Sequence, residues 1–168
     1  LLFYALDINH HEVPSPMIGR KIERIEGVVD LANNQSIISS PTVNDKPTLV
    51  HFWAFWCESC IKELATFKST VGNDVNVISI HPYSHRPSLI IDTLLAYDHP
   101  FEHIWMANDP SCVNSKETCD NFDIFFDLGV VSFPETILLD QDFHIQQVYR
   151  GVLTQEIWHE KFDPFLYT

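Results

Sequence analysis

Two cysteines, Cys57 and Cys60, stand where a strongly apolar run gives way to a helical pattern. The length and aromatic content of residues 48–55 predict a buried strand, and apolar side chains recur at helical spacing over residues 58–70. Cys57 is therefore expected at a helix N-terminus, where unpaired backbone N–H groups and the helix dipole stabilise a thiolate. Cys60, one turn later, could resolve a mixed disulfide. This placement favours thiol–disulfide exchange over an inert local disulfide or half a zinc site.

Side chains near the two cysteines should modify their chemistry. Glu58 opposes the stabilisation of a Cys57 thiolate, because a neighbouring anion disfavours it. His51 stands six residues before Cys57. Its imidazole could relay a proton to or from Cys60 near neutral pH, or it could be a core histidine held by one backbone hydrogen bond.

The rest of the chain supplies elements that can position this motif. Two short apolar runs within residues 28–38 predict a hairpin, and a turn at residues 140–142 predicts a second one. The succession of strands and helices predicts an α/β fold with a mixed sheet, part parallel and part antiparallel, flanked by helices. The remaining expected elements are strands at 75–80, 104–106, 135–139 and 144–150 and helices at 88–97, 120–128 and 155–166.

The cysteine motif carries a resemblance to a known superfamily. Residues 52–60, FWAFWCESC, resemble the active-site run of the thioredoxin superfamily. Residues 128–136, LGVVSFPET, are similar to the Gly-Val-x-x-x-Pro-Glu-Thr block of a narrower group, the cytochrome c biogenesis thioredoxins (CcmG or DsbE, TlpA-like). Residues 13–20, VPSPMIGR, and Tyr149-Arg150-Gly151 with Trp158 also fit that group, so the resemblance covers about residues 7–167.

The resemblance implies a thioredoxin-like fold and assigns roles to several residues. Cys57 would be the attacking thiol and Cys60 the resolving thiol. Pro134 would follow a cis peptide bond and line the groove for a partner's cysteine segment, with Phe133 making that groove apolar. Glu135 would be the acidic residue near the active site. The predicted supporting residues are Trp56, Glu58, Ser59, His51, Phe133, Pro134 and Glu135, with no metal and no cofactor.

The same resemblance implies a function and a compartment. The group consists of periplasmic reductants tethered to the inner membrane, which receive electrons from a DsbD-type membrane transporter. They pass these electrons to apocytochrome c or to a protein of the haem-ligation machinery. Two alternatives stay open: a periplasmic reductase or isomerase for oxidative or copper stress, and a module in which the two thiolates bind Cu(I) or dock a partner.

The domain division follows from the same patterns. Residues 28–168 are expected to form the thioredoxin-like domain, and residues 1–27 a lead-in that is polar from residue 7 onward. The apolar residues 1–6 at its start are interpreted either as a hydrophobic strand or frayed end, or as the remnant of a membrane anchor. The resemblance favours the anchor.

A second cysteine pair, Cys112 and Cys119, falls in a polar stretch that is interpreted as a loop insertion. In an oxidising compartment this pair is expected to form a structural disulfide. A second redox pair that exchanges with Cys57 and Cys60, or a four-cysteine zinc site, are the alternatives.

Composition limits the partners. The chain has 168 residues, a 45% hydrophobic content and a net charge of −13, which fits one globular domain. A surface this acidic repels phosphate backbones and anionic lipid. Nucleic acid is therefore not an expected partner, and a charged protein partner should be basic. No apolar run of about 20 residues spans a membrane, so membrane contact is expected only through an absent N-terminal anchor.

The nine histidines suggest a metal site only superficially. His81 and His85 share a four-residue spacing, as do His99 and His103, but a proline follows directly after His81 and another directly after His99. A broken helix cannot present both members of a pair on one face. Scattered surface histidines are therefore expected.

Overall fold

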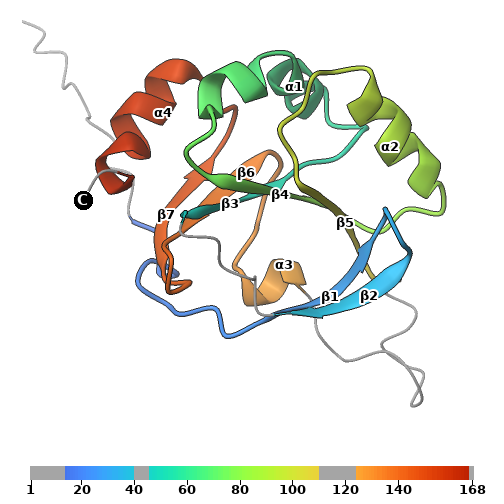
Figure 1. Ribbon diagram of the computed structural model, residues 1–168, viewed down its shortest axis with the longest axis horizontal. Helices are drawn as coiled ribbons and strands as arrows, with labels where there is room; N and C mark the ends of the chain where they lie inside the picture. Colours follow the sequence, from blue (N-terminus) through green and yellow to red (C-terminus); the bar gives the residue numbers. More distant parts are fainter. Residues whose placement is uncertain (1–13, 40–45, 110–123, 167–168) are drawn as a thin grey trace, which may run out of the picture.

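The computed structural model describes residues 14–39, 46–109 and 124–166, which form a seven-stranded mixed sheet with helices on both faces (Figure 1). Helices α1, α2 and α4 cover one face, and the short α3 lies against the other. The strands are β1 (Ile25–Asp30), β2 (Gln35–Ser39), β3 (Thr48–Phe52), β4 (Asn76–His81), β5 (His103–Ala107), β6 (Glu135–Leu139) and β7 (Ile145–Arg150). The helices are α1 (Glu58–Val71), α2 (Pro87–Leu95), α3 (Ile124–Asp127) and α4 (Gln155–Lys161), followed by the 3-10 turn η2 (Asp163–Phe165).

The strand order is β2-β1-β5-β4-β3-β6-β7. Strands β3, β4 and β5 run parallel, because helices α1 and α2 connect them as crossovers. The hairpins β1–β2 and β6–β7 add antiparallel pairs at the two edges. All five residues of β3 and all five of β6 are buried, so the segment that leaves β3 toward Cys57 starts from the rigid middle of the sheet.

Helix α1 begins at its cysteine for a local reason. Cys57 is the N-cap residue, and its sulfur accepts a hydrogen bond from the Cys60 backbone N–H. The helix ends at Gly72, whose φ of 70° a glycine adopts without steric cost. Its buried face, which includes Cys60, Leu64 and Phe67, packs on the sheet and fixes the position of the motif.

Two apolar cores lie on opposite faces of the sheet. One contains Trp53, Phe67 and Trp158 beneath helices α1, α2 and α4. The other contains Phe52 and Trp105 with Ile124 of α3. Ile22, from the segment before β1, also joins this second core, and the Ile22 N–H donates to the carbonyl of Phe143. The division into a lead-in to residue 27 and a domain from residue 28 stays a prediction.

The expected mixed sheet, both hairpins and the thioredoxin-like α/β architecture are confirmed. The helix expected over 155–166 is wrong in its second half: α4 ends at Lys161 and η2 follows. Pro164 lacks the N–H that would continue the helical ladder, so the chain tightens into a 3-10 turn there. Of the helix expected over 120–128, α3 occupies Ile124–Asp127, and residues 120–123 lie outside the described part.

Two further predictions concern parts of the chain outside the described residues. Cys112 and Cys119 both lie there, so their disulfide stays a prediction, and so does the anchor interpretation of residues 1–6. Within the described ranges, none of the helices combines the length and hydropathy needed to cross a bilayer.

Candidate active site

Cys57 and Cys60 are joined by a disulfide at the start of α1, with their Cα atoms 5.2 Å apart. The Cys60 backbone N–H points at the Cys57 sulfur (3.3 Å), and the Ser59 hydroxyl lies 3.3 Å from the same sulfur. Cys60 is fully buried, Cys57 is half-buried, and the Trp56 side chain beside them is 57% exposed. A partner can therefore reach Cys57 but not Cys60, which fits the expected division into an attacking and a resolving thiol.

The segment before β6 lies alongside the cysteine motif. The Phe133–Pro134 peptide bond is cis, as expected. In the antiparallel ladder Phe52 pairs with Glu135, so Pro134 adjoins the chain that leaves β3 toward Cys57. Phe133 is half-buried and contacts both apolar cores. The structure thus brings together two segments that are almost eighty positions apart in the sequence.

Glu135 has a buried side chain at the first position of β6. Its Oε2 accepts a hydrogen bond from the Val131 N–H (3.1 Å) and lies 3.4 Å from Nε of Arg150. Burial raises the pKa of Glu135, while the bond from Val131 and the charge of Arg150 act in the opposite direction. Its contacts tie the loop before Pro134 to the end of β7.

His51 is buried in the middle of β3 and faces two polar partners. Its Nδ1 lies 3.0 Å from the Thr136 hydroxyl, and its Nε2 lies 3.5 Å from Oε2 of Glu63. The rings of Phe67 and Phe101 pack against it. Both contacts are with side chains, so neither is the single backbone hydrogen bond expected if His51 were only a core histidine. A proton relay from His51 to Cys60 stays a prediction.

Glu63 is a buried carboxyl on α1 that the sequence analysis did not single out. Its Oε1 accepts a hydrogen bond from the Leu153 N–H, and its other oxygen faces His51. Burial raises the pKa of Glu63 to about 8 and lowers the pKa of His51 to about 3, so both side chains are neutral at pH 7. A signal was present: position 63 falls on the same helical stripe as Cys60, which should otherwise be apolar.

His81 contradicts the expectation of scattered surface histidines. Its side chain is fully buried at the end of β4, because β4 lies next to β3 in the interior of the sheet. Its Nδ1 lies 2.6 Å from the Pro82 carbonyl, and its Nε2 lies 3.0 Å from the Phe55 backbone nitrogen. The expectation holds better for His85 and His103, which are exposed.

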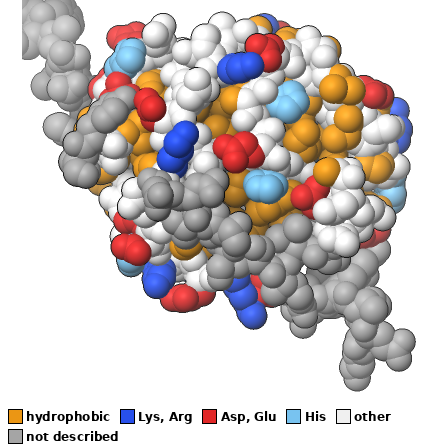
Figure 2. Space-filling view, viewed as in Figure 1, with side chains coloured by type: hydrophobic (Ala, Val, Ile, Leu, Met, Phe, Trp, Pro, Cys, Tyr) orange, Lys and Arg blue, Asp and Glu red, His pale blue; other side chains and the backbone are white. Residues whose placement is uncertain are grey.

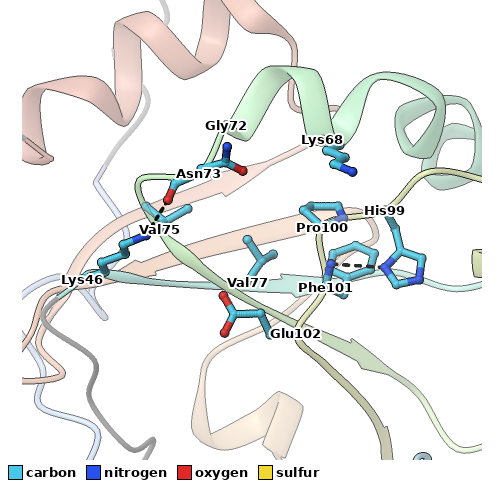
Figure 3. A pocket seen from close by; sticks show the side chains of 10 residues that line it. All are labelled: Lys46, Lys68, Gly72, Asn73, Val75, Val77, His99, Pro100, Phe101 and Glu102. Carbon is cyan, nitrogen blue, oxygen red and sulfur yellow. Dashed lines mark hydrogen bonds between the residues drawn. The ribbon is translucent and has the colours of Figure 1, made fainter.

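A small pocket lies at the other end of α1 (Figure 3). It has a volume of about 370 Å³, with Val75, Val77 and Phe101 among its lining residues. Its two lysines already have partners: Lys46 donates to the Asn73 carbonyl, and Lys68 pairs with Asp98 outside the lining. Because α1 has 14 residues, about 20 Å separate this pocket from Cys57. It is not part of the cysteine site.

Charged side chains of both signs are mixed across the face of the molecule shown in Figure 2. Hydrophobic side chains gather on the side of that face where α2 lies, and Leu95 at the end of this helix is 73% exposed. Across residues 14–39, 46–109 and 124–166, no three His, Cys, Asp or Glu side chains cluster so that they could hold a metal ion.

Sequence comparison finds similar proteins over nearly the whole length of this chain. No family model matches the chain. The thiol:disulfide interchange protein DsbE of Allochromatium vinosum is 26% identical over 167 residues, which cover 99% of this chain and 84% of that protein. The protein of the same name from Pseudomonas aeruginosa is 27% identical over 165 residues, covering 97% and 83%. The chain is a relative of the DsbE proteins.

The solved structures agree on the fold. StoA from Bacillus subtilis superposes with a TM-score of 0.56 at 18% identity, covering 86% of this chain and 98% of that one. The thioredoxin-like fold is therefore confirmed, and the DsbE relatives confirm the expectation of a thiol–disulfide oxidoreductase. The roles of the individual side chains around Cys57 and Cys60 stay predictions.

Proposed function

We propose that this chain is a periplasmic reductant that uses Cys57 and Cys60 to reduce disulfides of apocytochrome c or of a protein of the haem-ligation machinery. The observation that carries the proposal is the half-buried Cys57 near the cis-proline segment, with its disulfide partner Cys60 fully buried. The similarity to DsbE proteins over nearly the whole chain supports the same activity. A DsbD-type membrane protein would return electrons to the disulfide.

The reaction is a two-electron exchange between two disulfides. The Cys57 thiolate attacks one sulfur of the client disulfide, whose S–S bond breaks and releases a client thiolate. Cys60 then loses its proton and attacks the Cys57 sulfur. The Cys57–Cys60 disulfide forms, the second client thiolate leaves, and the client has gained two electrons. The buried position of Cys60 keeps this second thiol away from other clients.

The polar groups beside Cys60 have a proposed part in this second step. Cys60 and Glu63 are three positions apart on α1, so they share one helical face, and Glu63 in turn faces His51. Because Cys60 is fully buried, we propose that the proton it releases leaves by way of this pair. His51 is then a proposed relay group that acts together with Glu63.

The reduction potential of the Cys57–Cys60 pair tests the direction of the reaction. The protein would be equilibrated in thiol buffers of defined potential, and each cysteine pair quantified by alkylation and mass spectrometry. A potential at or below about −270 mV, the value for thioredoxin, supports an electron donor. A potential near about −120 mV, as in the oxidant DsbA, contradicts the proposal. The same samples show whether Cys112 and Cys119 titrate with the active site.

Trapping identifies the client. A Cys60→Ala variant cannot resolve the mixed disulfide and should accumulate a covalent adduct with an oxidised Cys-x-x-Cys-His peptide, the haem-attachment sequence. The Cys57→Ser variant is the matched control and should form no adduct. A matched peptide with scrambled residues around the two cysteines measures selectivity. Equal trapping of both peptides would contradict a preference for apocytochrome c.

A further inference from the structure

The buried imidazole of His81 contacts the turn that leads into Cys57. This turn runs over residues 54–57 and is closed by a hydrogen bond from the Cys57 N–H to the Ala54 carbonyl (3.0 Å). The N–H of Phe55, in the middle of the turn, points at Nε2 of His81 (3.0 Å). The turn is therefore held at two points, and one of them is a side chain from the neighbouring strand.

The hydrogen bonds determine which tautomer His81 adopts. A carbonyl oxygen can only accept, so the contact with the Pro82 carbonyl requires a hydrogen on Nδ1. In a neutral ring the other nitrogen then has a free lone pair, and the Phe55 N–H points at it. Both ring nitrogens are satisfied without any charge. Burial also lowers the pKa of His81 to about 4, so the ring stays neutral at pH 7.

Ring packing reinforces the hydrogen bonds. Phe55 stacks on His81 with ring centres 5.1 Å apart, and Trp56 meets it edge-on at 5.0 Å. Trp53 also packs edge-on at 5.3 Å, and its indole N–H donates to the Ser79 hydroxyl on the same strand as His81. Ser79 and His81 thus hold the segment before Cys57 through one polar contact each.

We propose that His81 is a positioning residue for thiol–disulfide exchange, which holds the turn over residues 54–57 so that the Cys57 sulfur meets the backbone N–H groups at the start of α1. The Cys60 N–H already lies 3.3 Å from that sulfur. Donors held in place stabilise the thiolate that attacks the client, and a turn free to move loses part of this stabilisation. His81 neither gives nor takes a proton in the reaction.

Two substitutions of similar size separate this role from simple burial. The amide of glutamine can occupy the place of Nε2 and accept from Phe55, so H81Q keeps the contact with the turn. The amide of asparagine reaches only the place of Nδ1, so H81N keeps the Pro82 contact and loses the one to Phe55. We expect H81N to slow alkylation of reduced Cys57 at pH 7 by about three- to tenfold, the range for one lost hydrogen bond. H81Q should restore most of the rate.

The readouts are the alkylation rate of Cys57 from pH 4 to 10 (about ten points) and the urea midpoint of each variant. Support for the proposal is a midpoint of the alkylation profile that moves to higher pH in H81N and returns toward wild type in H81Q. The proposal would be overturned if both variants had wild-type alkylation profiles. It would also be overturned if their alkylation rates fell only in parallel with their urea midpoints. His85→Asn, at an exposed histidine outside the turn, is the control that leaves the Phe55 contact in place.

A measurement on the unaltered protein covers the case in which the variants do not fold. Nitrogen chemical shifts of His81 should show hydrogen on Nδ1 only, and a coupling across the hydrogen bond should link Nε2 to the Phe55 N–H. A solvent-exposed or charged His81 at pH 7 would overturn the proposal. The inference rests on Cys57 and Cys60 being the redox pair of the proposed function. Alkylation needs no client, so failure to reduce the haem-site peptide would not be mistaken for failure of the His81 role.

Discussion

Glu63 and His51 show how a protein can keep two ionisable side chains in its core without charging either. Burial removes each side chain from water, and this loss of hydration favours the neutral form of each. The 3.5 Å between His51 Nε2 and Glu63 Oε2 leaves room for the proton on the carboxyl to point at the imidazole. The pair therefore places a side chain of β3 against one of α1, three positions after Cys60 in the sequence.

Replacing Glu63 should change the pH dependence of stability. Because burial raises the pKa of Glu63 from 4.5 to about 8, the folded protein keeps a proton that the unfolded chain releases. The stability that the folded protein gains by keeping this proton is fully present below pH 4.5 and is lost as the pH rises to about 8. Glu63→Gln keeps the shape without the ionisation. From pH 5 to 8, the unfolding free energy of E63Q should gain on wild type by on the order of a few kcal/mol.

Urea unfolding of the two oxidised proteins checks this, since disulfide-bonded cysteines do not titrate and add no pH dependence. Parallel curves for wild type and E63Q over that range would show that Glu63 is already ionised in the folded protein.

Glu58 should slow the chemistry of the neighbouring cysteine. Its carboxylate is exposed in the first turn of α1 and pairs with Lys62 at 2.7 Å. Glu58→Gln removes an anion beside the Cys57 thiolate, so alkylation of reduced Cys57 near neutral pH should become about two- to threefold faster at low salt. Lys62→Gln is the matched opposite change and should slow it. Identical rates in all three proteins would show that solvent screens this charge completely.

Among the elements, the β6–β7 hairpin depends on one side chain in its turn. The Asp140 carboxylate accepts hydrogen bonds from the N–H groups of Asp142 and His144 (2.9 Å each) and from the side chain of Gln146 (2.6 Å). Asp140→Ala should lower the free energy of unfolding by about 1–3 kcal/mol. Asp140→Asn keeps an acceptor oxygen and should lose less. Urea midpoints equal to that of wild type in both variants would show that the turn holds without these bonds.

The elements were largely predictable because their signals are local. Cys57 caps α1 and Gly72 ends it, and both features are visible in the sequence. The hairpin turns at residues 33–34 and 140–142 fall between apolar runs, and both hairpins formed as expected. The end of α4 was missed although Pro164 marks it, because apolar residues continue beyond the proline at spacing that a helix would also give.

At the scale of the whole molecule, net charge should decide which clients react fastest. The chain carries −13, so its field attracts positively charged peptides and repels negatively charged ones. A basic disulfide peptide should be reduced faster than an acidic peptide of the same length at ionic strength of about 10 mM. The difference should shrink at about 0.5 M, where the Debye length falls to a few ångströms. Stopped-flow rates test this, and a difference unchanged by salt would contradict an electrostatic origin.

The sequence alone determined the redox motif, its place between strand and helix, and the fold class, because these depend on residues close together in the chain. The resemblance of separated blocks added Pro134 and Glu135. Only the tertiary structure showed which groups the side chains of Glu63 and His81 contact. Glu63 contacts His51 on β3, and His81 contacts the turn before Cys57. Both contacts form only once β3, β4 and α1 have packed. Burial turns these polar side chains into neutral, tightly held groups, and burial is a property of the fold, which no short segment encodes by itself.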